Sequence, residues 1–208
     1  MHDMNRGTRF PTLLRRALIC TILLLTGVEG ILSDDILVLD DFSRADGRPI
    51  VGVSWEGFTD RVMGGQSQRE SGMEPDEDRQ VLRMRGRVAL ENNGGFIQMR
   101  LALASSGTYD AGRYRGVVAE VRSRAPHTDG YFLHLRTRRT RFPWSHYRAP
   151  IEPGLEWQRI SVAFDRFEPQ YMFGNSPPDP KTLRSIAIVA AGDEFSADIE
   201  VRMVGFYR

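Results

Sequence analysis

Two segments, Asp60-Arg61-Val62-Met63-Gly64-Gly65-Gln66-Ser67 and Leu90-Glu91-Asn92-Asn93-Gly94-Gly95-Phe96, decide how the rest of the chain is interpreted. Each places two adjacent glycines beside polar side chains and an apolar residue. Adjacent glycines are costly inside a strand, because folding removes the backbone freedom that glycine has when unfolded. They are expected where φ is positive, or where another backbone or a ligand comes very close. Asn-Gly is also a strong turn signal, so two separate tight turns are one interpretation.

A second interpretation treats the two segments as one feature. We predict that they lie side by side at one end of a β-sandwich and fix each other's conformation. The four glycines would supply positive φ values or close approaches that a Cβ forbids, and Gly94 is expected at a positive φ. Polar side chains of both segments should bond the loop backbone, which would otherwise stay unpaired: Asp60, Ser67, Asn92 and Asn93. Trp55 and Phe96 would form the apolar floor beneath them.

From Ile36 onward, apolar and polar residues alternate and turn residues interrupt them, a pattern typical of strands. In the strand 116–122, Val117, Ala119 and Val121 should face the core, and Glu120 and Arg122 the solvent. Short helices are expected only near 165–167 and 179–183, with surface loops at 71–79 and 168–180. The predicted strands are 36–42, 54–59, 81–85, 87–90, 96–102, 116–122, 131–137, 157–164, 185–191 and 197–204. This order predicts an all-β sandwich or barrel.

The glycine segments also carry a resemblance to a known family. Trp55, the segment 60–67, Gly86 and the segment 91–100, in this order, resemble the complex I intermediate-associated protein 30 family. The likeness continues through 131–137 and 154–159 and covers Leu37 to Arg208. It implies a jelly-roll β-sandwich of the galactose-binding-like type. It also implies a role like that of the mitochondrial members, which assist assembly of respiratory complex I, and it supplies no catalytic residues.

The first 30 residues have the pattern of a targeting segment. Four arginines precede the apolar block Ala17 to Leu25, and small residues follow it. This pattern predicts a secretory signal peptide, and the block is short for a transmembrane helix. An uncleaved anchor and a mitochondrial presequence are the alternatives. We therefore expect a leader at residues 1–30, one domain at 31–208, and a periplasmic or secreted protein.

Composition excludes several classes of function. The single cysteine, Cys20, lies inside the leader, so the mature chain has no thiolate metal site, disulfide or cysteine nucleophile. Without the four arginines and two acidic residues of the leader, the chain keeps 24 basic and 25 acidic side chains. A nucleic-acid binder should have a basic surface, so that class is disfavoured.

Catalytic and metal sites have little support. The chain contains none of the common nucleophile, zinc or phosphate-loop motifs. His134 and His146 could form a two-histidine site, although no carboxylate stands at a spacing that completes it. Asp60 and Glu91 could act as an acid/base pair or simply accept hydrogen bonds in turns. We predict no enzyme and no cofactor, with a structural calcium at Asp40, Asp41 and Asp198 as a further hypothesis.

A binding face has more support. If the strands 96–102 and 131–137 are neighbours, their outward residues combine planar hydrogen-bonding groups with aromatic rings. The basic run Arg136 to Trp144 fits the same role or a solvated strand end. Met63 of the first glycine segment, and Tyr147 beside His146, complete the set. The predicted binding residues are Trp55, Asp60, Met63, Gly64, Gly65, Ser67, Glu91, Asn92, Asn93, Gly94, Gly95, Phe96, Gln98, Arg100, His134, Arg136, Trp144 and Tyr147.

These observations predict a non-catalytic binding or assembly module that acts on a protein partner. Aromatic residues and arginine with little lysine are typical of protein interfaces. The alternative is a carbohydrate-binding module of the cell envelope. An enzyme that acts on glycans is the third hypothesis. An exported protein would lie on the wrong side of the membrane from the matrix-side arm of complex I. No nucleic-acid partner is expected, and membrane contact only through an uncleaved leader.

Overall fold

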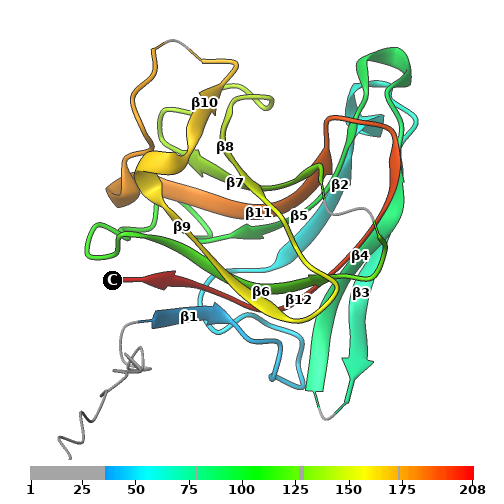
Figure 1. Cartoon of the computed structure of the whole chain (residues 1–208). Coiled ribbons are helices and arrows are strands. Elements are labelled where there is room, and N and C mark those ends of the chain that lie inside the picture. The colour runs from blue at the N-terminus through cyan, green and yellow to red at the C-terminus, as the bar shows by residue number, and fades with distance from the viewer. Residues whose placement is uncertain (1–35, 78, 127–128, 173) are drawn as a thin grey trace, which may run out of the picture. The chain divides into compact units, whose positions relative to one another are not determined.

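The computed structural model describes residues 36–77, 79–126, 129–172 and 174–208, with Asn93 described by its backbone alone. These residues form two β-sheets packed face to face, and every strand pair is antiparallel (Figure 1). The all-β jelly-roll sandwich predicted from the sequence is thereby confirmed. The predicted leader lies outside the described residues. Within the described ranges, no helix is long and apolar enough to cross a membrane.

The first sheet is organised around its long C-terminal strand. Strand β12 pairs with β4 along its first half and with β6 and β1 along its second half. The sheet order is β3 (Gln68–Asp76), β4 (Arg79–Val88), β12 (Phe195–Tyr207), β6 (Gly116–Ser123) and β9 (Gln158–Ala163), with β1 (Ile36–Asp40) also on β12. The chain therefore closes by pairing its first described strand with its last.

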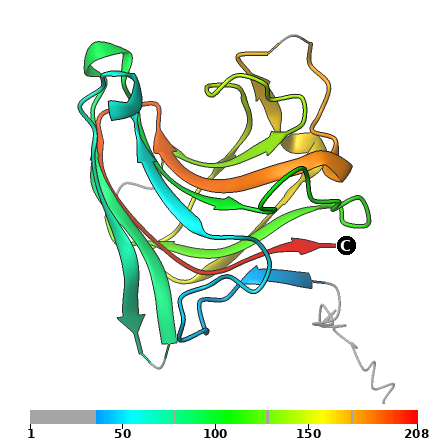
Figure 2. The same cartoon turned by 180° about the vertical axis from the view of Figure 1, so that it is seen from behind.

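The second sheet has β11 at its centre. Its order is β10 (Glu168–Gln170), β8 (His146–Ile151), β7 (Tyr131–Thr137), β11 (Leu183–Ala191), β5 (Phe96–Ala102) and β2 (Trp55–Thr59). Both sheets curve in the same direction, and the outer face of the second sheet lies on the concave side (Figures 1 and 2).

Strict alternation of apolar residues builds the core between the sheets. In β5, Ile97, Met99 and Leu101 are buried, and the residues between them are partly exposed. Strand β6 follows its predicted pattern, because Val117, Ala119 and Val121 belong to the core cluster. Glu120 and Arg122 are partly exposed, as expected for the outer face.

Three strands were not predicted from the sequence. The predicted loop 71–79 is wrong, because β3 pairs with β4 as a hairpin over most of that range. Strand β8 was missed, and β10 occupies the start of the predicted loop 168–180. The predicted strands 81–85 and 87–90 are one strand, since β4 continues through Gly86. The two short helical turns are confirmed as η4 (Phe164–Arg166) and η5 (Pro180–Thr182).

The two glycine segments are the points where the chain crosses from one sheet to the other. The first holds the 3₁₀ turn η2 (Asp60–Met63) between β2 and β3. The second holds η3 (Glu91–Asn93) between β4 and β5. Because β4 pairs with β3 and β5 with β2, both crossings lie at the same end of the sandwich.

The carboxylate of Asp60 joins the two crossings. This side chain is fully buried. Its oxygens accept hydrogen bonds from Ser67 N at 3.0 Å, Gly95 N at 2.6 Å and Phe96 N at 3.4 Å. The Ser67 hydroxyl donates to the same carboxylate and accepts from Ala89 N at 3.0 Å. The predicted mutual locking of the two segments is therefore confirmed, with one aspartate at its centre.

The four glycines are required for two different reasons. Gly64 and Gly95 have φ values of +92° and +122°, which L side chains rarely adopt. Gly94 has a φ of −75°, so the predicted positive φ there is wrong. A Cβ on Gly94 would overlap an Asp60 carboxylate oxygen, and a Cβ on Gly65 would overlap the same carboxylate. Gly65 and Gly94 are therefore needed for close approach to Asp60.

Of the other residues predicted to support the two crossings, Asn92 lies at the crossings and Trp55 does not. Asn92 donates to the Gly64 carbonyl oxygen at 3.4 Å. Trp55 does not lie beneath the crossings, because it begins β2 and Asp60 follows the end of that strand. Its indole N–H donates to Asp40 at 2.8 Å instead. The predicted apolar floor is therefore wrong for Trp55.

We expect Asp60→Asn to destabilise the fold by about 3 kcal/mol or more, because the amide nitrogen cannot accept the bonds that the carboxylate accepts and leaves buried N–H groups unpaired. Urea denaturation measures this change. Asp193→Asn, an exposed position, serves as the matched control and should stay within about 0.5 kcal/mol. Equal stability of the two variants would contradict a central role for Asp60.

The two kinds of glycine should respond differently to substitution. A Cβ added at Gly64 would meet open space but keep a left-handed φ, so Gly64→Ala should cost about 1–2 kcal/mol. Gly64→Asn should cost less, since Asn tolerates that conformation. Gly94→Ala and Gly94→Asn should both cost more than Gly64→Ala, because each displaces Asp60. Thermal denaturation of the four variants compares them, and rescue by Asn at position 94 would oppose the steric explanation.

Candidate functional site

The outer face of the second sheet brings together planar polar and aromatic side chains from its strands. Alternation along each strand and the cross-strand register place its residues in rows. Its outward side chains are Glu56, Phe58, Phe96, Gln98, Arg100, Phe132, His134, Arg136, His146, Arg148, Glu168, Gln170, Ser185, Ala187 and Val189. We call this surface the concave face.

The binding-face hypothesis assumed that the strands 96–102 and 131–137 are neighbours. They share this face, but they do not pair with each other. Strand β11 lies between them and pairs with both. Its outward residues, Ser185, Ala187 and Val189, are small, and none is more than 5% exposed. Because these small residues are buried, longer side chains from the neighbouring strands must cover them.

Two histidines stack on this face. The rings of His134 on β7 and His146 on β8 lie 4.0 Å apart between centroids, with an interplanar angle of 16°. His146 Nδ1 lies 2.8 Å from the Trp144 carbonyl oxygen, which can only accept, so Nδ1 carries the proton and donates. The His134 Nε2 atom is buried and has no hydrogen-bond partner. A polar atom in that state is costly unless a ligand or water binds it.

Both histidines are neutral at pH 7. Burial is the main cause that holds the pKa of His134 well below its usual value, and the charges of His146 and Arg148 add to it. Burial also lowers the pKa of His146, and Arg148 and Arg136 lower it further against the opposing bond to Trp144. Neutral imidazoles can each accept a hydrogen bond from a hydroxyl group.

An aromatic loop stands beside the histidines, between β7 and β8. Phe142 and Trp144 stack with ring centroids 5.3 Å apart and an interplanar angle of 3°, although each is about half exposed. The Arg136 guanidinium holds this loop by donating to the carbonyl oxygens of Thr140 at 3.2 Å and Phe142 at 2.7 Å. The basic run thus positions an exposed aromatic pair.

Tyr171 extends the aromatic surface from the segment after β10. It is 74% exposed, and its ring lies 6.0 Å from that of His146. The Ser145 hydroxyl donates to its carbonyl oxygen at 3.0 Å, which ties the two segments together. Tyr171 has a φ of +54°, an uncommon value for a bulky residue. The aromatic loop and Tyr171 therefore form one exposed wall.

Two arginines lie over aromatic rings, one on each side of β11. The Arg100 guanidinium is 4.3 Å from the Phe58 ring centroid, and Glu56 neutralises it at 2.9 Å. The Arg148 guanidinium is 4.6 Å from the Phe132 ring centroid. These contacts fix the two arginines as flat, partly exposed surfaces.

The predicted binding residues do not form one site. Phe96, Gln98, Arg100, His134, Arg136 and Trp144 lie on the concave face or its aromatic loop. The crossings at Asp60–Ser67 and Glu91–Gly95 lie at the Phe96 end of β5, whereas the aromatic loop follows β7 at the opposite end (Figure 1). A strand of seven residues spans about 23 Å. Met63, Glu91 and Asn92 are exposed at the crossing end.

Tyr147 is the clearest misplacement in that set. It faces inward from β8 and is fully buried in the core. Conversely, Arg148, Tyr171 and Phe58 belong to the concave face and were not singled out. His146 and Arg148 alternate with the apolar residues Tyr147 and Ala149. This alternation is typical of a strand and could have predicted that Arg148 faces outward beside His146. Nothing local in the sequence indicates where Tyr171 lies.

The carboxylates proposed for other chemistry have structural partners. Asp60 is saturated by its hydrogen bonds, which leaves it unsuited to act as an acid or base with Glu91. Asp40 pairs with Val204 of β12, away from Asp198, so these carboxylates do not form one calcium site. Burial raises the pKa of Asp40, which accepts from Phe42 N and Trp55. Among the described residues, no three His, Cys, Asp or Glu side chains group as metal ligands.

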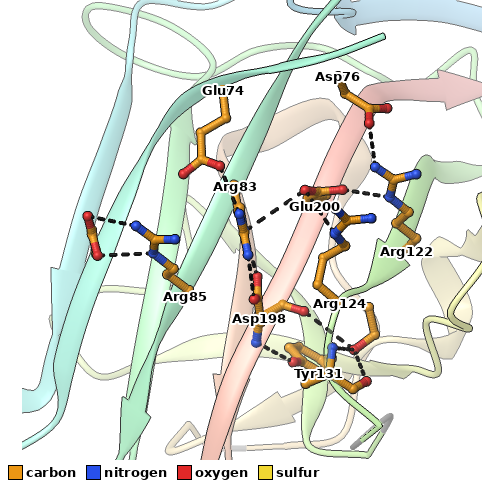
Figure 3. A network of polar contacts seen from close by, with 12 residues as sticks. Glu74, Asp76, Arg83, Arg85, Arg122, Arg124, Tyr131, Asp198 and Glu200 are labelled. Atoms are coloured by element: carbon orange, nitrogen blue, oxygen red, sulfur yellow. Dashed lines mark hydrogen bonds and ion pairs between the residues drawn. The ribbon is translucent and has the colours of Figure 1, made fainter.

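The outer face of the first sheet is different, because its charges neutralise one another (Figure 3). Arg83 donates twice to Asp198, at 2.8 and 2.7 Å. Arg122 pairs with Glu200 at 2.6 Å and with Asp76 at 2.5 Å. The other pairs on this face include Arg83–Glu74, Arg85–Glu70, Arg159–Glu120 and Arg202–Glu120.

The fold is shared with carbohydrate-binding modules of known structure. The family 11 carbohydrate-binding module of a Clostridium thermocellum cellulosomal cellulase superposes with a TM-score of 0.63 at 14% identity, covering 83% of this chain and 95% of that one. The same family 11 module solved with a β-1,3-1,4-mixed-linked tetrasaccharide gives 0.61 at 13% identity, with 83% and 94% covered. A family 30 module of another cellulase of this organism gives 0.55 at 13% identity, with 82% and 96% covered. At these identities the likeness concerns the fold.

Sequence comparison adds the family. No curated protein matched the chain. The sequence profile of the complex I intermediate-associated protein 30 family matches residues 45–201, which include both sheet crossings and the central strands of both sheets. The resemblance seen in the glycine segments is confirmed, and the chain belongs to the complex I intermediate-associated protein 30 family.

Proposed function

We propose that this protein is a non-catalytic carbohydrate-binding module that binds a glycan chain across the concave face, against the aromatic wall. The observation that carries the proposal is the exposed, stacked pair of Phe142 and Trp144 beside two neutral, stacked histidines. Sugars offer two kinds of surface, C–H patches and hydroxyl groups, and this face provides complementary groups for both.

The aromatic wall suits the C–H patches of a sugar. Trp144 is 51% exposed and Tyr171 is 74% exposed, and both are tied in place by hydrogen bonds through their own or neighbouring backbone. A flat ring held in position loses little conformational freedom when a ligand stacks on it. Such fixed, exposed rings are unusual in a protein that leaves them unused.

The histidines suit the hydroxyl groups. A neutral imidazole offers one donor and one acceptor, and a hydroxyl can satisfy either. His146 is partly exposed, and because its Nδ1 donates to the Trp144 carbonyl oxygen, its Nε2 can accept a hydrogen bond from a sugar hydroxyl. Similarity in fold to modules that are named for carbohydrate binding supports the same proposal.

The acidic residues of this face do not suit glycoside hydrolysis. Glu56 on β2 and Glu168 on β10 are its two carboxylates within the described ranges, on opposite edge strands. Five strand spacings separate them, about 24 Å, whereas glycosidases hold their two carboxyl groups about 5–10 Å apart. Glu56 is also paired with Arg100. We therefore propose binding without catalysis.

A protein partner, favoured from the sequence, becomes the second outcome of the test. The proposal also places the protein outside the cytoplasm, on the strength of the predicted leader, where envelope or extracellular glycans are present. The curvature of the face favours a glycan over a protein partner. A curved face with buried polar atoms suits a narrow polymer better than it suits a flat protein surface.

Trp144→Ala should weaken glycan binding about 30-fold, the loss of about 2 kcal/mol expected when a central aromatic contact is removed. A microarray of plant, algal and bacterial polysaccharides would identify the best ligand, and calorimetry with its oligosaccharide would measure the change. Leu155→Ala, another exposed apolar position (59%), is the control and should bind like the wild type. No binding to any polysaccharide at millimolar concentration would contradict the proposal and favour a protein partner.

The neutral histidines predict a pH dependence of stability. The pKa of His134 is lowered on folding, so the unfolded chain binds the proton more tightly, and stability falls as pH drops through about 6.5 towards the lower folded value. His134→Phe keeps a ring against His146 and removes this titration. Thermal melts should show a smaller loss of stability between pH 7.5 and 5 for the variant than for the wild type. If the melting temperatures of the variant and the wild type fell equally with pH, the result would contradict a lowered pKa of His134.

A further inference from the structure

The concave face carries more positive than negative charge. Its arginines are Arg100, Arg136 and Arg148, joined by Arg184 at the register shift of β11. Its carboxylates are Glu56 and Glu168. One arginine, Arg100, has an ion pair there, with Glu56 at 2.9 Å. No described carboxylate lies within 4.0 Å of the guanidinium groups of Arg136, Arg148 or Arg184.

The other sheet gives the internal comparison. On its outer face, Arg83 and Arg122 each contact two or more carboxylates (Figure 3). Glu120 pairs with two further arginines, Arg159 and Arg202. Most outward arginines of the first sheet are thus paired with carboxylates, Arg87 being an exception, whereas among the described residues of the concave face only Arg100 is paired. Unpaired charge in a concave site attracts ligands of opposite sign, because the field is focused there.

Arg136 is the most constrained of these arginines. Its guanidinium bonds only to neutral carbonyl groups of the aromatic loop, and its Nε is buried without a partner. Burial, and after it the charges of Arg100 and Arg184, hold the pKa of Arg136 below its usual value. Like charges gathered in this way repel one another, and an anion bound among them would relieve that repulsion.

Arg148 extends the positive region to the histidines. It lies over the Phe132 ring, and its charge reaches both His134 and His146. Glu168 is its cross-strand neighbour, yet no ion pair joins them. Arg148 therefore presents a flat guanidinium with free donors beside the aromatic wall, in the arrangement that binds carboxylate or sulfate oxygens.

We infer that the glycan bound by this face is anionic, a polysaccharide whose sugars carry carboxylate or sulfate groups. Arg148 and Arg184 bind the acidic substituents, and the aromatic wall binds the sugar rings. The inference rests on the proposed function and specifies its ligand class. A carboxylate and a sulfate share this chemistry, so both belong in the test.

Calorimetry should compare four probes: a hexuronate oligosaccharide, a sulfated oligosaccharide, a mixed-linked β-glucan oligosaccharide as the neutral sugar, and polyglutamate as an acidic polymer without sugar. We expect at least one acidic sugar to bind about tenfold or more tightly than the neutral one, with affinity falling as NaCl rises from about 0.05 to 0.5 M.

Arg148→Gln and Arg184→Gln should each weaken binding of that acidic sugar about tenfold, the loss of one charge-assisted contact, without lowering the melting temperature. Arg85→Gln is the matched control, since it removes the same charge from the opposite face, where Glu70 pairs with it. It should leave the affinity unchanged.

The outcomes separate the two proposals. Neutral sugar bound as tightly as the acidic sugars would overturn the inference and leave a carbohydrate-binding module. Polyglutamate bound as tightly as the acidic sugars would also overturn it. So would a loss of affinity in Arg85→Gln equal to that in Arg148→Gln and Arg184→Gln, because the attraction would then be a property of net charge. Failure of every sugar to bind would overturn the proposed function itself.

Discussion

The carboxylate of Asp60 is the interaction on which the arrangement of the two sheets depends. It is buried, and it accepts bonds from both segments that carry the chain from one sheet to the other. Burying a carboxylate is favourable only when donors surround it, and here four donors converge because Gly65 and Gly94 leave room for them. The glycine pairs thus make room for the aspartate, and the aspartate ties together the crossing that follows β2 and the crossing that precedes β5.

Cross-strand register within each sheet gives the two outer faces different chemistry. On the first sheet it places arginines opposite carboxylates, so the outer face is closed by its own ion pairs. On the second sheet it places small residues on β11 between the long side chains of β5 and β7. The result is a concave surface with polar atoms left unpartnered at His134 and Arg136. The proposed binding site lies on the face whose groups are less fully satisfied within the fold.

The missed strands show where local patterns fail. Strand β3 has the sequence Gln-Arg-Glu-Ser-Gly-Met-Glu-Pro-Asp, which lacks apolar alternation because it is an edge strand stabilised by pairing and by contacts such as Glu74 with Arg83. Strand β8 contains Pro150, and a proline argues against a strand because it has no backbone N–H to donate to a neighbouring strand. Tertiary pairing with β4 and β7 overrode local propensity in both.

Local sequence patterns were enough to predict the sandwich, most of its strands, the family and the importance of the glycine segments, because alternation and glycine pairs are local signals of strands and of constrained loops. They also placed Gln98, Arg100, His134 and Arg136 on the same side of their strands, since side chains alternate with a period of two. The folded protein was needed to show that β11 separates those strands, that Tyr147 points inward, and that Ser145 ties the Tyr171 segment to the aromatic loop. Strand order and loop docking depend on contacts between residues far apart in the chain, and no local pattern records them.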